Sequence, residues 1–273
     1  MSENDAIQKS SDGPVTIESL KGDLQKLGLK AGMTVVVHSS LSSLGWVCGG
    51  SVAVIKALEE VLTEEGTLVM PTHSGDYSLP ELWQHPPVPK EWCATIKKSM
   101  PAFNPELTPT RSMGRIPETF RKQPGVLRSY HTQVSFAAWG KHSELITKDH
   151  NLEFSLGEGS PLARIYELHG YALLLGVGYD RNTSIHLAEY RANYPSKKIT
   201  NSGGPVIEGG RRVWKEFPDI NTDSDDFIEI GKAFEGEFSG LVRIGKVGYS
   251  TSRLMPQREL VDFAVEWMEV NRL

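Results

Sequence analysis

The sequence predicts an α/β protein whose sheet contains a parallel crossover unit, and two observations lead to this prediction. Short, continuous runs of β-branched and other apolar residues, which are typical of buried strands, alternate along the chain with stretches of helical periodicity. In addition, residues 33–73 contain a strand pattern, a helix pattern and a second strand pattern, in that order. This order is typical of two parallel strands joined by a helix.

The chain of 273 residues has an ordinary globular composition, and its length suits one large domain. Residues 1–14 are polar and acidic, and we expect them to be flexible. Residues 15–273 are expected to form a single domain. At its start, Thr16 is expected to cap an amphipathic helix that ends at Leu27, with Gly28 at its C-terminal end.

The crossover unit follows this helix. Residues 33–40 form its first strand pattern and residues 67–73 its second. Both are short, apolar and continuous, so we expect buried strands. Ser51 is expected to cap the helix between them, and Gly66 to close it.

A proline-rich segment, residues 74–115, interrupts this regular pattern. Its seven prolines exclude a long regular element. Long irregular segments in compact domains are usually functional or disordered. Because this segment also holds Tyr77, Trp83 and Trp92, we expect an ordered excursion that packs over the sheet on the substrate side.

Regular elements return after residue 115. A Ser-Pro pair at residue 160 is typical of a helix start, and Gly209-Gly210 are expected to form the turn of a hairpin. The expected helices are residues 116–125, 160–170, 226–236 and 256–270; the expected strands are residues 134–140, residues 171–178 and the two arms of the hairpin within residues 205–217.

Composition and charge restrict the classes of function. The net charge is −5 and there is no basic stripe, so nucleic acid is not an expected partner. No apolar run is long enough to span a membrane, and the N-terminal residues lack the features of a signal peptide. Cys48 and Cys93 form neither a zinc spacing nor a disulfide framework, so we expect a cytoplasmic protein without a metal. The acidic balance is compatible with a cationic small-molecule substrate, and no feature indicates an oligomeric state.

A loop of small residues, 38–51, links the first buried strand to the following helix. Its glycines would let backbone N–H groups and the helix start approach a phosphate or pyrophosphate. It matches neither the Walker motif nor the dinucleotide fingerprint, and a tight loop that needs small residues explains the same pattern. Cys48 in this loop is either an acyl-accepting nucleophile or, as we favour, a small semi-buried residue without a catalytic role.

The stretch "NTSIHLAEYRANYP" follows the expected strand 171–178 and contains His186 and Glu189. Three residues apart on a helix, the two side chains would share a face at the carboxyl end of a strand, where α/β sheets bind ligands. Two residues are too few for a metal site. The residues alone leave open a catalytic base or a histidine that merely starts a helix. Downstream, residues 216–226 are rich in acids. Asp225 or Ser224 is expected to cap the next helix, and one carboxylate of this stretch would orient a catalytic histidine.

Five segments, in this order and spacing, resemble the aminoglycoside N3-acetyltransferase family, also called the antibiotic acetyltransferase family. Together they extend from near the first helix to the C-terminal end. The segments are "VVVHSSLSSLGWVCGG", "GTLVMPTHS", "TPTRSMGRIPETFRKQPGVLRSYHTQVSFAAWG", "EGSPLARIYELHGYALLLGVGYDRNTSIHLAEYRANYP" and "GYSTSRLMPQRELVDFAVEWM". The resemblance implies an α/β/α sandwich of the family's own type, distinct from the GNAT fold. It also implies an enzyme that uses acetyl-CoA to acetylate the 3-amino group of aminoglycoside antibiotics, and thereby confers resistance.

The resemblance also implies roles for individual residues. His186 falls on the catalytic histidine, Asp219 on its acidic partner, and Glu189 on a supporting acid that lines the site. The substrate contacts we expect are Asp76, Tyr77 and Glu189, because the proline-rich segment should set the choice of substrate and its acids Asp76 and Glu81 could meet ammonium groups. The implied acetyl-CoA contacts are His38, Ser39, Ser40, Leu41, Gly45, Thr72, Arg115, Ser135 and Phe136.

These roles fit the chemistry of amine acetylation. His186 would accept the amine proton while Asp219 orients its ring, and direct transfer needs no enzyme nucleophile. Three alternatives stay open: transfer to another small amine, a hydrolase with Ser39 or Cys48 as nucleophile, and a CoA-binding protein without catalysis. The absence of a G-x-S-x-G motif counts against the hydrolase.

Overall fold

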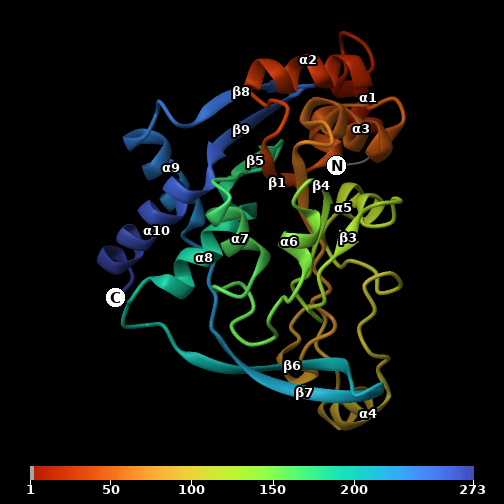
Figure 1. Ribbon diagram of the computed structural model, residues 1–273, viewed down its shortest axis with the longest axis vertical. Coiled ribbons are helices and arrows are strands. Elements are labelled where there is room, and N and C mark those ends of the chain that lie inside the picture. The colour runs from red at the N-terminus through yellow and green to blue at the C-terminus, as the bar shows by residue number, and fades with distance from the viewer. Residues whose placement is uncertain (1–2) are drawn as a thin grey trace.

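The computed structural model describes residues 3–273, which are built around a mixed seven-stranded sheet with the strand order β3-β4-β2-β1-β5-β9-β8 (Figure 1). The central strand β1 pairs in parallel with β2 and β5, whereas the outer strands join antiparallel. The strand bounds are β1 (Thr34–Ser39), β2 (Thr67–Pro71), β3 (Leu127–Arg128), β4 (Phe136–Gly140), β5 (Tyr171–Leu175), β8 (Arg243–Val247) and β9 (Ser250–Pro256).

Helices cover both faces of this sheet, because both faces of its central strands are apolar. On β1, Val36 packs into one core cluster, while Val35 and Val37 pack into the other. The first cluster lies under α7 (Pro161–Glu167), α8 (Ser184–Arg191), α9 (Phe227–Glu237) and α10 (Gln257–Asn271), and the second under α2 (Ile17–Leu27), α3 (Gly50–Leu62) and α5 (Arg115–Phe120). A short helix, α6 (Ser143–Thr147), follows β4. The predicted α/β class and its parallel crossover unit are confirmed.

The first predicted helix has the expected ends. Thr16 is the N-cap of α2, and its Oγ1 atom accepts a hydrogen bond from the backbone N–H of Ser19 at 3.2 Å. Gly28 closes the helix with φ +107, a left-handed conformation that favours glycine. The expected cap of the crossover helix is wrong: the N-cap of α3 is Gly49, and the hydroxyl of Ser51 bonds Thr119 instead, at 2.8 Å.

The segment expected to be flexible contains a helix, α1 (Glu3–Lys9), that the sequence analysis did not predict. It packs beside the 3₁₀ turn η1 (Leu41–Leu44), and the ammonium group of Lys9 donates to the carbonyl of Ser43 at 2.8 Å. The polar pattern concealed this helix because Ala6 is its one buried residue in the described part of the chain.

The proline-rich excursion contains short pieces only, as predicted: η2 (Pro80–Leu82), η3 (Lys90–Trp92) and α4 (Cys93–Ser99). Arg128 ties it to the sheet. Its guanidinium donates to the carbonyls of Pro105, Thr108 and Thr72. The excursion is therefore an ordered layer with a partly buried arginine at its base.

The predicted hairpin forms a separate two-stranded sheet of β6 (Ile199–Glu208) and β7 (Arg211–Ile220), turning at Gly209-Gly210. In Figure 1 it lies across the end of the molecule beside α4. None of the helices in residues 3–273 is long and apolar enough to cross a membrane.

Candidate functional site

A pocket of about 850 Å³ opens where β1 and β5 end. Its walls are the loop after β1, residues 176–183 after β5, residues 112–117 at the start of α5, and the side chains of Glu3 and Ala6 on α1. Parallel neighbouring strands bring these loops to one edge of the sheet, which is where α/β folds bind ligands.

Most of the predicted cofactor residues line this pocket: His38, Ser39, Ser40, Leu41, Gly45 and Arg115. The pocket also has features that suit phosphate groups. The guanidinium of Arg115 makes no hydrogen bond or ion pair with any other residue in the described range 3–273. Gly50 and Gly114 have φ +58 and φ +83, and a Cβ atom added to either would meet no heavy atom within 4 Å. The pocket wall is therefore open at the starts of α3 and α5, and Arg115 makes the α5 side cationic.

Three of the implied cofactor residues do not lie on the pocket surface, which is a correction to the sequence analysis. Thr72 and Ser135 are fully buried, and their side chains hydrogen-bond each other at 3.2 Å. Phe136 is buried in the core cluster beneath α7 and α8. Antiparallel pairing of β2 with β4 brings these three residues together. Of the three, Thr72 and Ser135 accept hydrogen bonds from the guanidinium of Arg128, which also binds the excursion.

His38 presents an unpaired donor to the pocket. Burial, followed by the nearby His186, lowers the pKa of His38 to about 3, so its ring is neutral at pH 7. Nε2 accepts a hydrogen bond from the backbone N–H of Thr183 at 3.0 Å, which places the ring proton on Nδ1. That Nδ1 atom, like Oγ of the neighbouring Ser39, is buried without a hydrogen-bond partner in the described residues.

His186 lies near the start of α8, three residues after Thr183, which lines the pocket. Its Nδ1 atom is 2.5 Å from Oε2 of Glu189, one turn further along the helix. Its ring packs edge-on against Phe227 with centroids 4.8 Å apart, and 20% of the side chain is exposed. Within the described part of the chain, Nε2 has no hydrogen-bond partner. The histidine thus has one nitrogen fixed by a carboxylate and the other free.

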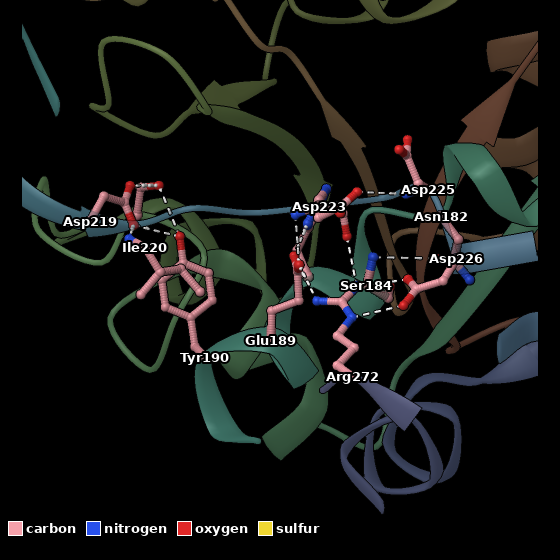
Figure 2. Close-up of polar contacts among 12 residues, drawn as sticks. Asn182, Ser184, Glu189, Tyr190, Asp219, Ile220, Asp223, Asp225, Asp226 and Arg272 are labelled. Carbon is pink, nitrogen blue, oxygen red and sulfur yellow. Dashed lines mark hydrogen bonds and ion pairs between the residues drawn. The ribbon is translucent and has the colours of Figure 1, made fainter. Parts of the chain in front are cut away.

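Glu189 is completely buried, and three groups share its carboxylate (Figure 2). Oε2 faces His186, while Oε1 accepts from the guanidinium of Arg272 and from the backbone N–H of Asp223, each at 2.7 Å. Arg272 in turn binds the carboxylate of Asp226. That pairing explains why Asp226, the N-cap of α9, makes no side-chain cap. The expected cap at Asp225 or Ser224 is wrong, because the helix begins one residue after Asp226.

The expected pairing of Asp219 with His186 is wrong. The carboxylate of Asp219 accepts from the hydroxyls of Ser155 and Tyr190, each at 2.6 Å, and Figure 2 shows it with Tyr190, to one side of the Glu189 network. Burial and the charge of Asp219 raise the pKa of Tyr190. The carboxylate of Asp219, on β7, is engaged by Ser155 and Tyr190. The carboxylate beside His186 is therefore that of Glu189.

The substrate-side residues lie on the loop after β2. Asp76 is 3.8 Å from Arg111, and both are partly exposed. Tyr77 packs edge-on against Phe103. Cys48 lies in the turn before α3 and is exposed.

Three further residues lie near the site and were not predicted from the sequence. His73 follows β2; burial, then the nearby His186, lowers its pKa to about 3, and its Nε2 atom has no partner in residues 3–273. Arg181 lines the pocket and is paired with Asp180. Arg272 is 83 residues from Glu189 and carries no local motif. Only His73 had a sequence signal, as a histidine at the end of a buried strand.

The chain was matched over residues 36–269 by the family model described as aminoglycoside 3-N-acetyltransferase. It is 52% identical to the SPbeta prophage-derived aminoglycoside N(3')-acetyltransferase-like protein YokD of Bacillus subtilis, over 96% of this chain and 95% of that protein. It is 37% identical to aminoglycoside N(3)-acetyltransferase VII of Streptomyces paromomycinus, over 97% of this chain and 95% of that protein.

Solved structures share the whole fold. The crystal structure of YokD from Bacillus subtilis has a TM-score of 0.95 at 50% identity, covering 98% of each chain. AAC-IIIb in a binary complex with CoASH has a TM-score of 0.84 at 31% identity, covering 94% of this chain and 97% of that one. AAC-VIa bound to sisomicin has a TM-score of 0.85 at 28% identity, covering 95% and 99%.

Proposed function

This chain belongs to the aminoglycoside 3-N-acetyltransferase family, and on that premise we propose that it transfers the acetyl group of acetyl-CoA directly to the 3-amino group of aminoglycosides, with His186 as general base. The proposal rests on the hydrogen bonding of the two ring nitrogens of His186. Glu189 fixes its Nδ1 atom, whereas Nε2 is free among the described residues and one fifth of the side chain is exposed. This is the arrangement that a base needs.

The base acts at one step of the transfer. Nε2 of His186 accepts a proton from the amine while the amine nitrogen bonds to the acetyl carbon. The carbon–sulfur bond breaks, its electron pair goes to sulfur, and the proton held by His186 passes to that sulfur. The products are an N-acetyl aminoglycoside and CoA. Glu189 stabilises the imidazolium that exists between these proton transfers.

Acetyl-CoA supplies an activated acetyl thioester, and the pocket residues fit it. The free guanidinium of Arg115 and the open wall at Gly50 suit the phosphates of the nucleotide end. The unpaired Nδ1–H of His38 and Oγ of Ser39 lie nearer the histidine, where they suit polar atoms of the pantetheine or thioester end. The CoASH complex of AAC-IIIb supports this assignment.

The amine substrate is assigned from the names of the relatives and from the negative charge of Asp76, which would attract an ammonium group. Several relatives are named as aminoglycoside N(3)-acetyltransferases, and AAC-VIa was solved with sisomicin. Asp76 and Tyr77 are our proposed substrate contacts, and Asp76 would exchange part of its pairing with Arg111 for an ammonium group. Glu189, which was also expected to contact the substrate, is completely buried and engaged by His186 and Arg272. Because acetyl-CoA is an intracellular metabolite, the proposed reaction places the protein in the cytoplasm.

The test is a coupled assay with pure protein. Acetyl-CoA, a thiol dye and a panel of aminoglycosides and other small amines are mixed, and CoA release is followed. Amine-dependent release together with a product acetylated at the 3-amino group, located by NMR, supports the proposal. Release without any amine would instead indicate hydrolysis. Release with other amines but with no aminoglycoside would overturn the assigned substrate.

A further inference from the structure

The carboxylate of Glu189 needs a cation to remain charged where it lies. It is fully buried, and a buried carboxylate without a counter-charge is unstable in its ionised form. Neutral Glu189 could not stabilise a protonated His186. The cation that contacts it is Arg272, whose Nη1 atom is 2.7 Å from Oε1. Lys197 also lies on this side of α8, but its ammonium group donates to the backbone carbonyls of Tyr190 and Ala192.

Arg272 is held in place through all five of its N–H donors. Nε and one N–H of Nη2 bind the carboxylate of Asp226, at 2.8 and 2.7 Å, and the second N–H of Nη2 binds the carbonyl of Asp223 at 2.7 Å. Nη1 donates to Glu189 and, at 3.2 Å, to the hydroxyl of Tyr194. A guanidinium with every donor engaged has a fixed position, which a lysine with three donors cannot reproduce.

The charges of this network suit a histidine that gains a proton. Glu189, Asp226 and Arg272 together carry one net negative charge beside neutral His186, and protonation of the histidine makes the group neutral. Burial disfavours the charged guanidinium, yet the hydrogen bonds with Asp226 and Glu189 outweigh it and raise the pKa of Arg272 above its ordinary value. Arg272 therefore stays charged throughout the reaction.

We propose that Arg272, the penultimate residue of the chain, is a positioning residue that keeps Glu189 ionised and aimed at Nδ1 of His186. It acts through Glu189 and does not touch the substrate. This inference rests on the proposed function, because it assigns a role within the same site. It also gives the C-terminal end of α10 a function, since the last turns of that helix pack on α8 and carry the arginine to the glutamate.

Substitutions of Arg272 test this role. Arg272→Ala is expected to lower kcat by roughly 10- to 100-fold, less than loss of the base itself, while KM for acetyl-CoA stays near its wild-type value. Arg272→Lys keeps the charge and should recover part of kcat. The matched control is Arg258→Ala on the same helix, whose guanidinium binds the carbonyl of Tyr166, and wild-type kcat is expected.

Two truncated variants provide a second test. They remove residues from the end of the chain and so leave no internal cavity. A chain that ends at Arg272 loses only Leu273, which is 92% exposed, and should keep its activity. A chain that ends at Asn271 should resemble Arg272→Ala. Thermal melts of each variant show whether the protein is folded under the assay conditions, so that a lower kcat is not caused by unfolding.

The tautomer of His186 gives a readout that does not depend on turnover. In ¹⁵N NMR of histidine-labelled protein, with the signal assigned by its loss in His186→Ala, the wild type should show the proton on Nδ1. In Arg272→Ala the Nδ1–H fraction should fall. A folded Arg272→Ala protein with wild-type kcat and an unchanged tautomer would overturn the inference. If the wild type acetylates no amine, the proposed function fails, and the tautomer alone then decides the role of Arg272.

Discussion

Glu189 and His186 lie one helical turn apart on α8, with Oε2 of the first 2.5 Å from Nδ1 of the second. Three-residue spacing on a helix brings side chains together without help from distant segments. The carboxylate is completely buried, whereas one fifth of the histidine side chain is exposed. The pair therefore leaves one nitrogen, Nε2, free among residues 3–273 and keeps its charge partner away from water.

Removing the base should affect chemistry and leave cofactor binding unchanged. His186→Ala is expected to lower kcat by ~10²–10⁴-fold, because general-base assistance is typically of that size. The Kd for CoA should change little, since the pocket is formed by the loop after β1 and residues 112–117. Steady-state kinetics on the best aminoglycoside and calorimetry with CoA measure the two quantities. Near wild-type turnover in the folded variant would contradict the assignment of His186.

The two acids near the histidine should behave differently. Glu189→Gln removes the charge beside Nδ1 and leaves Arg272 facing a neutral amide, so we expect kcat to fall roughly 10- to 100-fold. Asp219→Asn disturbs the contacts with Ser155 and Tyr190, so we expect a lower Tm with kcat largely retained. Kinetics and thermal melts on both variants check this. The reverse pattern, with Asp219→Asn inactive and Glu189→Gln active, would restore Asp219 as the partner.

Local patterns made much of the fold predictable. Thr16 and Gly28 bound α2 as expected because capping depends on residues that are close in sequence. The hairpin turn at Gly209-Gly210 was predictable for the same reason. Strand β9 was missed because its buried positions include Ser250 and Ser252, which break the apolar alternation that marks a strand.

The site was predictable where its residues are neighbours and unpredictable where the fold brings them together. The contact of His186 with Glu189 follows from helical spacing. Arg272 reaches the same carboxylate from the far end of the chain, through packing of α10 on α8, and nothing in the sequence links the two. Asp219 was misplaced for the same physical reason, because its neighbours Ser155 and Tyr190 are set by tertiary structure.

Cys48 should be dispensable. It is exposed in the turn before α3 and does not line the pocket. Cys48→Ala is expected to keep wild-type kcat, and mass spectrometry of the wild type with acetyl-CoA should show no acetylated cysteine. A stable acetyl adduct on Cys48, together with an inactive alanine variant, would instead indicate a covalent intermediate.

Stability should fall as the pH drops below neutral. Burial is the main cause that lowers the pKa of His38 and His73 to about 3 and that of His131 to about 4, and it takes the pKa of His150 well below its usual range. In the unfolded chain these groups bind protons near pH 6.5, so the unfolded state holds more protons than the folded one between that pH and about 4. Each histidine then costs roughly 1.4 kcal/mol of stability per pH unit.

Urea unfolding at a series of pH values from 7 to about 4.5 measures this slope. His73→Asn should reduce the slope of the unfolding free energy against pH by roughly 1.4 kcal/mol per pH unit, the contribution of one proton. The pKa of His73 lies far below the range titrated, so this histidine contributes over the whole range. The exposed His85 supplies the control, and His85→Asn should leave the slope unchanged. A free energy of unfolding that is flat over this range would show that the buried histidines gain protons while the protein is folded.

Two arginines that line the same pocket should differ in their effect on acetyl-CoA binding. Arg115 has no partner in residues 3–273, whereas Arg181 is paired with Asp180 at 3.0 Å. A free guanidinium gains a full charge-assisted contact with a phosphate, while a paired one must share its charge. Arg115→Ala should therefore raise KM for acetyl-CoA more than Arg181→Ala does, with kcat nearly unchanged for both. The increase should shrink in high salt, because ions screen the exposed Arg115 contact in the wild type. Equal KM values for Arg115→Ala and the wild type across a salt series would place the phosphates elsewhere in the pocket.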